Sequence, residues 1–108
     1  DSVYTIDILL SSTTKSDLLK DLYLITRELY ENASKHSQAK FVNIIIEDKK
    51  GSIELRYHDN GIGFQKSKTT QGIGMSSIRK RVNELNGQMS ITDQKSGPHI
   101  TIQVSSDN

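Results

Sequence analysis

The feature that most constrains this 108-residue chain is a run of apolar residues with helical spacing between positions 18 and 33. They recur every three or four positions, which places them on one face of an amphipathic helix. The run consists of Leu18, Leu22, Ile25, Leu29 and Ala33. We expect this helix from about Ser16 to His36, begun by the pattern Thr14-x-x-Asp17. Its apolar face must be buried, so the rest of the chain has to supply a surface for it.

Segments with alternating apolar and β-branched residues predict that surface. We expect strands at residues 3–10, 40–47, 52–58, 88–92 and 99–104. Turns are expected at residues 48–51 and at Ser96-Gly97-Pro98. A second helix is expected from about Met75, stopped by Gly87. This order predicts an α+β fold in two layers, with helices covering one face of a sheet.

Composition narrows the class of protein. The chain has 14 basic and 13 acidic residues, interspersed, with a net charge of +1, which argues against a nucleic-acid partner. It has no cysteine, which excludes disulfides, thiolate metal sites and cysteine nucleophiles. The length fits one domain over residues 1–108. Since the chain opens on a strand pattern without Met, we expect it to be part of a longer protein.

The first polar cluster lies on the long helix. Glu28, Asn32 and Lys35 are four and three residues apart, so they share a face beside the apolar stripe. Carboxylate and amide oxygens are ligands for Mg²⁺, and a lysine offsets phosphate charge. The alternative is an ordinary solvated flank of an amphipathic helix.

The second cluster follows a predicted strand. Asp59 comes two residues before the first of two closely spaced glycines, Gly61 and Gly63. A carboxylate at a strand end can accept a hydrogen bond from an exocyclic amine, and glycine lets the backbone approach a ligand. A simple Asp-Asn-Gly turn is the alternative interpretation.

The third cluster is Gly72-Ile73-Gly74, which leads into the helix beginning near Met75. Amides at a helix start bind phosphate, and serines 76 and 77 add donors there. A flexible entry to a helix would look the same. The segment lacks the pattern of a P-loop and the tight strand-to-helix turn of a dinucleotide fingerprint.

Together these segments resemble a known superfamily. RELYENASKH at 27–36, DNGIGF at 59–64 and GIGMSSIRKRV at 72–82 are similar to the N box and glycine boxes of the GHKL ATPases. That superfamily includes histidine kinases, type II topoisomerases, mismatch-repair ATPases and a heat-shock chaperone. In detail, these motifs resemble those of sensor kinases related to the nitrate, cell-wall and membrane-fluidity sensors. The resemblance implies a Bergerat fold, with a mixed, mostly antiparallel sheet.

The resemblance also implies roles for individual residues. Asn32 is expected to ligate Mg²⁺, and Glu28 to support the metal or its water, so both are candidate catalytic residues. Lys35 and His36 are expected near the phosphates of ATP. Asp59 is expected to hydrogen-bond the adenine amino group.

The glycines imply a lid over the nucleotide, opened by Gly61 and Gly63. Further nucleotide contacts are expected from Gly72, Ile73, Gly74, Met75 and Arg81, with Arg79 on the same basic helix. One position departs from the family pattern. Pro98 follows Gly97 where the family usually has a threonine that helps to bind adenine, and proline has neither a hydroxyl nor a backbone N–H.

The implied function is transfer of the ATP γ-phosphoryl to a histidine on a separate dimerisation segment of the same protein, for relay to a response regulator. The fragment is expected to be monomeric, and the intact kinase a homodimer. A cytoplasmic domain of a membrane-anchored protein fits this reading. His58 and His99 lie in predicted strands and are expected to be structural.

Other functions remain open at this stage. They are an ATP-binding docking module without efficient catalysis, an anti-sigma-factor-type serine kinase, and a structural domain without a ligand.

Overall fold

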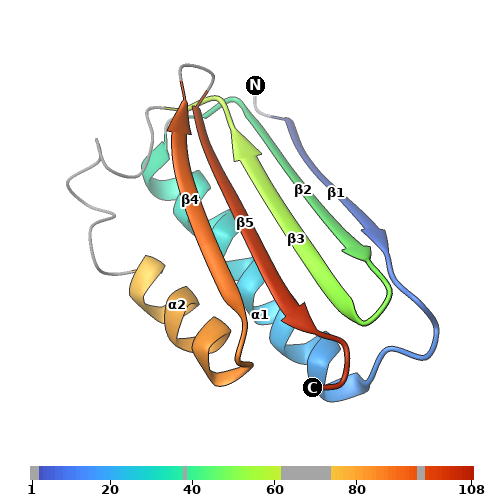
Figure 1. Cartoon of the computed structure of the whole chain (residues 1–108). Helices are drawn as coiled ribbons and strands as arrows, with labels where there is room; N and C mark the ends of the chain where they lie inside the picture. Colours follow the sequence, from blue (N-terminus) through green and yellow to red (C-terminus); the bar gives the residue numbers. More distant parts are fainter. Residues whose placement is uncertain (1–2, 38, 62–73, 95–96) are drawn as a thin grey trace.

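The computed structural model describes residues 3–37, 39–61, 74–94 and 97–108. Over these residues it shows one mixed sheet with helices packed on one of its faces (Figure 1). The elements are β1 (Val3–Leu9), α1 (Ser16–Asn32), η1 (Ala33–Ser37), β2 (Phe41–Asp48), β3 (Ser52–Asp59), α2 (Gly74–Glu84), β4 (Gln88–Gln94) and β5 (Gly97–Ser105). The predicted order of elements and the two-layer α+β architecture are confirmed.

The sheet has the strand order β1-β2-β3-β5-β4. β1 runs parallel to β2, and the other neighbouring pairs are antiparallel, as predicted for a mostly antiparallel mixed sheet. Ile44 of β2 lies opposite Tyr57 of β3, which in turn lies opposite Ile100 of β5. Because strand side chains alternate, this register directs one apolar row toward the helices.

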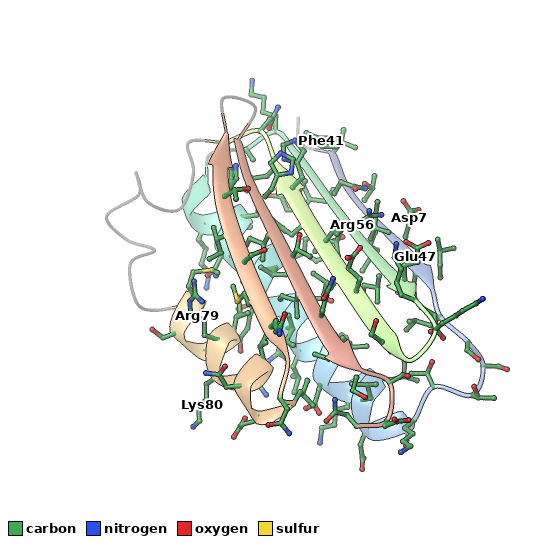
Figure 2. All side chains as sticks on the ribbon, in the orientation of Figure 1. Asp7, Phe41, Glu47, Arg56, Arg79 and Lys80 are labelled. Atoms are coloured by element: carbon green, nitrogen blue, oxygen red, sulfur yellow. The ribbon has the colours of Figure 1, made fainter. Side chains whose placement is uncertain are left out.

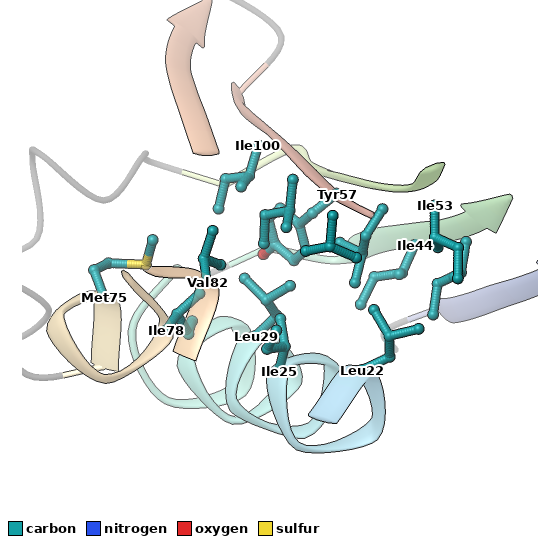
Figure 3. Close-up of a cluster of buried hydrophobic side chains, with 14 of the residues drawn as sticks. Leu22, Ile25, Leu29, Ile44, Ile53, Tyr57, Met75, Ile78, Val82 and Ile100 are labelled. Carbon is teal, nitrogen blue, oxygen red and sulfur yellow. The ribbon is translucent and has the colours of Figure 1, made fainter. Parts of the chain in front are cut away.

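The core lies between that row and the two helices (Figure 3). Ile25 and Leu29 of α1 are fully buried against the sheet, as the apolar spacing predicts. Ile78 and Val82 of α2 close the same cluster from the side. The opposite face of the sheet carries polar side chains such as Arg56, whose Nη2 lies 3.7 Å from Glu47 Oε1 (Figure 2).

The start of α1 differs from the prediction. The residue before the helix is Lys15, which makes no side-chain capping hydrogen bond. Thr14, the expected cap, instead donates its hydroxyl to the carbonyl oxygen of Ser11 at 2.8 Å. The Thr14-x-x-Asp17 capping pattern is therefore wrong, because the threonine closes the preceding turn. At the other end, the predicted helix changes to a π-helix at Ala33.

The end of α2 also differs in detail. The helix stops at Glu84, and the residue with a positive φ of 54° is Asn86. The backbone N–H of Gly87 then donates to the carbonyl of Val82 at 2.8 Å, which completes a Schellman-type cap. Gly87 is needed for space, because a Cβ there would lie 2.6 Å from the carbonyl oxygen of Gln103.

The two strand connections agree with the prediction in part. The turn between β2 and β3 has positive φ at Lys50 and Gly51, as a tight hairpin requires. Gly97 and Pro98 were expected in the turn between β4 and β5, but both belong to β5 itself. Among the described helices, none is both long and apolar enough to cross a membrane.

Candidate functional site

The carboxylate of Glu28 links α1 to α2. Its Oε1 accepts a hydrogen bond from Ser77 Oγ at 3.0 Å and another from Arg81 Nε at 3.3 Å. Its Oε2 is buried and has no hydrogen-bond partner among the described residues. A buried carboxylate oxygen that receives no hydrogen bond lowers the stability of the fold. That atom is therefore suited to receive a cation or a water molecule.

Asn32, one turn along α1, is also buried and also faces α2. Its Nδ2 lies 3.9 Å from the sulfur of Met75, in the first turn of α2. The sequence therefore placed Glu28 and Asn32 correctly on one face, and the structure brings both against the helix that follows the glycine segment. Lys35 lies in the π-helical turn that continues α1 and is exposed. The same turn contains the backbone of His36, whose side chain is outside the described part.

Asp59 ends β3 and is completely buried. One carboxylate oxygen, Oδ1, accepts the backbone N–H of Gly61 at 2.7 Å. The other, Oδ2, accepts a short hydrogen bond from the hydroxyl of Tyr57. Burial raises the pKa of Tyr57, and the hydrogen bond to Asp59 raises it further, so the tyrosine is a fixed neutral donor. Each oxygen retains a lone pair with which to accept another donor.

Gly97 makes the neighbouring backbone approach possible. Its φ is +114°, and a Cβ at this position would lie 1.9 Å from the carbonyl oxygen of Asp59. Only glycine allows the start of β5 to lie this close to the end of β3. The carbonyl of Pro98 lies 3.2 Å from Nδ1 of His58, so Pro98 contributes a backbone acceptor on the open face of the sheet.

His58 and His99 form a stacked pair across β3 and β5, with ring centroids 4.0 Å apart. Nε2 of His99 is buried and has no hydrogen-bond partner among the described residues. Burial lowers the pKa of His99, and the adjacent His58 lowers it further, while Asp59 acts in the opposite direction. Both histidines lie in strands, as predicted.

Some predicted site residues lie outside the described part of the chain, namely Gly63, Gly72 and Ile73. Gly74 is the first residue of α2. Arg79 and Lys80 are both exposed on α2 (Figure 2). Arg81 contacts Glu28 in this structure.

Sequence reasoning missed two partners. Tyr57 lies two residues before Asp59 on one strand, so strand alternation alone places both side chains on the same face. The bond between Ser77 and Glu28 joins residues 49 positions apart, and no local pattern reveals it. Ser77 was expected to bind phosphate, whereas here its hydroxyl holds the carboxylate.

The site residues therefore come from three elements that lie close in space. The C-terminal half of α1 lies beside the first turns of α2, and β3 ends near the last turns of α1 (Figure 1). Glu28 and Asn32 contact the first turns of α2 at this corner, and the buried carboxylate of Asp59 lies at the end of β3. Residues 18–108 match the family model of the histidine kinase-, DNA gyrase B- and HSP90-like ATPases.

The chain belongs to this family. The match covers most of the sequence and includes all three polar clusters. It confirms the resemblance that the N box and the glycine boxes indicated. Members of this ATPase family bind ATP, which agrees with the predicted nucleotide.

Individual relatives and structures agree with this assignment. The chain is 38% identical over 88 residues to the sensor histidine kinase ComP of Bacillus subtilis, covering 78% of this chain and 11% of ComP. It is 40% identical over 90 residues to the sensor histidine kinase YdfH of the same organism, covering 79% of this chain and 22% of YdfH. The chain thus spans less than a quarter of the length of either relative.

A solved structure supports the same fold. The histidine kinase AdeS of Acinetobacter baumannii superimposes with a TM-score of 0.76, covering 98% of this chain and 55% of that one. Its sequence identity is 21%, so this similarity concerns the fold.

Proposed function

We propose that this chain is the ATP-binding catalytic domain of a two-component sensor histidine kinase. It would transfer the γ-phosphoryl group of ATP to a histidine on a separate dimerisation segment of the same protein. A response regulator would then receive the phosphoryl group. The observation that carries the proposal is the contact of Glu28 and Asn32, on one helix face, with the first turns of α2.

The adenine end of the site is assigned to Asp59. Its buried carboxylate is held by Tyr57 and by the N–H of Gly61, which fixes both oxygens before a ligand arrives. A preorganised acceptor binds an exocyclic amine without the cost of ordering a side chain. Pro98 lacks the hydroxyl of the usual threonine, so more of the adenine recognition depends on Asp59.

The phosphate end is assigned to the start of α2, to Lys35 and His36, and to Arg81. Amides at a helix start attract anionic oxygens. The segment between the two glycine motifs would close over ATP. It is preceded by Gly61 and Gly63 and followed by Gly72, Ile73 and Gly74. Met75, at the first turn of α2, would line the nucleotide site next to Asn32.

Glu28 and Asn32 would hold Mg²⁺. The buried, unpartnered Oε2 of Glu28 fits a cation or its water, and Mg²⁺ requires only one or two protein oxygens when phosphates supply others. When bound, the ion would neutralise charge on the phosphates during transfer. The chain's own contribution is to orient ATP and to supply donors around the phosphates.

The proposal has a direct test. The domain is combined with a histidine-bearing dimerisation segment and Mg-ATP, and protein phosphate is measured before and after mild acid. Acid-labile phosphate is expected, and it should be absent with Asn32→Ala although that variant keeps its circular dichroism spectrum. Full activity of the Asn32→Ala variant would refute the proposed role of Asn32 in the site.

The same assay separates the alternatives. Acid-stable phosphate would indicate a serine kinase, and ATP binding without transfer would indicate a docking module. The departure at Pro98 favours the docking module as the second candidate.

The wider context is also proposed. Residues 1–108 would belong to a catalytic ATP-binding domain that is monomeric by itself, in a kinase that forms a homodimer through its dimerisation segment. We also propose that the domain faces the cytoplasm in a protein anchored in the cell membrane.

A further inference from the structure

The two oxygens of the Glu28 carboxylate have different surroundings. Oε1 receives both hydrogen bonds from α2, one from the hydroxyl of Ser77 and one from Arg81. Oε2 is covered by protein and receives none from the described residues. The described residues thus hold the carboxylate through Oε1 and donate no hydrogen bond to Oε2.

Ser77 is well placed to fix that orientation. It lies four residues before Arg81 on α2, so both donors project from the same side of the helix. Met75 and Ile78 on either side of it are buried in the core, which anchors this turn against α1. Ser76, by contrast, is exposed.

The two donors differ in what they contribute. Arg81 is partly exposed, with 31% of its side chain accessible, and its long side chain carries a charge that can also meet a phosphate. Ser77 has a short neutral side chain on an anchored turn, and its hydroxyl oxygen lies 3.0 Å from Oε1. Its hydroxyl therefore holds Glu28 without adding charge to the site.

We infer that Ser77 is a positioning residue for Glu28: by occupying Oε1 it leaves Oε2 as the atom that meets the metal ion or its water. The inference rests on the proposed binding of Mg-ATP at this site. Partners that orient a metal ligand commonly change metal affinity or activity by about 10–100-fold when removed. The role is indirect, since Ser77 acts through Glu28.

Calorimetric titration of ATP into the chain, with Mg²⁺ and in its absence with a chelator, tests the inference. For Ser77→Ala we expect the gain in ATP affinity due to Mg²⁺ to fall about tenfold, with metal-free ATP affinity unchanged. Ser77→Thr keeps the hydroxyl and should retain the gain. Ser90→Ala, which removes an exposed serine hydroxyl on β4, is the control and should behave like the unsubstituted chain.

A second comparison removes the residue through which Ser77 acts. In a Glu28→Ala background, Ser77→Ala should cause no further loss of the Mg²⁺-dependent gain. An unchanged gain in Ser77→Ala alone would overturn the inference, as would an equal loss of affinity with and without Mg²⁺, which marks a structural effect.

The outcome for the unsubstituted chain separates the two proposals. If that chain binds Mg-ATP and supports phosphoryl transfer while Ser77→Ala does the same equally well, only the role of Ser77 is refuted. If the unsubstituted chain does not bind Mg-ATP, the proposed function and the role of Ser77 both fail.

Discussion

Replacing Tyr57 by phenylalanine tests how Asp59 is held in place. The Tyr57 side chain is 1% exposed, and its hydroxyl donates to the buried carboxylate of Asp59. The substitution keeps the ring and its packing but removes this donor from a fully buried acceptor. A hydrogen bond to a charged group contributes about 1.5–3 kcal/mol to the free energy of unfolding. We therefore expect Tyr57→Phe to destabilise the domain by about 2 kcal/mol.

Urea denaturation followed by circular dichroism measures this loss, and thermal denaturation provides a second measure. For a domain of this size, about 2 kcal/mol corresponds to a fall in Tm of roughly 10 °C. Tyr23→Phe is the matched control, because Tyr23 is 62% exposed, and it should change stability by less than about 0.5 kcal/mol.

A double-mutant cycle with Asp59→Asn identifies the partner. If Tyr57 acts through the carboxylate, the two substitutions should be coupled by about 1 kcal/mol or more. The reasoning is refuted if Tyr57→Phe is as stable as the Tyr23→Phe control, or if its effect adds fully to that of Asp59→Asn.

Two further predictions concern the same end of the sheet. Gly97→Ala places a Cβ 1.9 Å from the carbonyl oxygen of Asp59 at a φ of +114°, so we expect a loss of about 3 kcal/mol or more in urea denaturation. Gly51→Ala, at a φ of +91° with no atom within 4 Å of the new Cβ, should cost only about 1 kcal/mol, and equal losses would contradict the steric argument. Because the pKa of His99 is lowered in the folded state, the unfolded chain binds more protons near its ordinary pKa of 6.5. The contribution of His99 to the free energy of unfolding should therefore be complete above about pH 6.5. It should decline as the pH falls toward the pKa of His99 in the folded state. Urea denaturation between pH 5 and pH 8 should show a weaker decline in His99→Phe, and an identical decline in both proteins would exclude His99 as the cause.

The helices and strands were predictable because their signals are periodic and local. The spacing from Leu18 to Ala33 indicates a helix in any globular context, and the β2–β3 hairpin follows from the turn residues around Gly51. Two boundary signals misled because a competing local contact was stronger. Thr14 bonds to Ser11 instead of capping α1, and α2 ends before the predicted stop at Gly87, with the positive φ at Asn86.

Within the candidate site, the common helix face of Glu28 and Asn32 was predictable, but their contacts with α2 were not. The spacing of Glu28 and Asn32 gives their common face without any tertiary information. Their partners on α2 depend on how the two helices pack, and that packing is set by core residues such as Ile78. The pairing of His58 with His99 likewise depends on the register between β3 and β5.

The proposed function requires that α1, β3 and α2 form one shared nucleotide site. Backbone amide NMR shifts of the chain, recorded during titration with Mg²⁺ and a non-hydrolysable ATP analogue, test this directly. We expect the largest changes together at Glu28, Asn32, Asp59, Gly61 and Met75, with little change on the open face of the sheet around Arg56. Saturable changes centred on that open face, with Asn32 and Asp59 unaffected, would contradict the assignment.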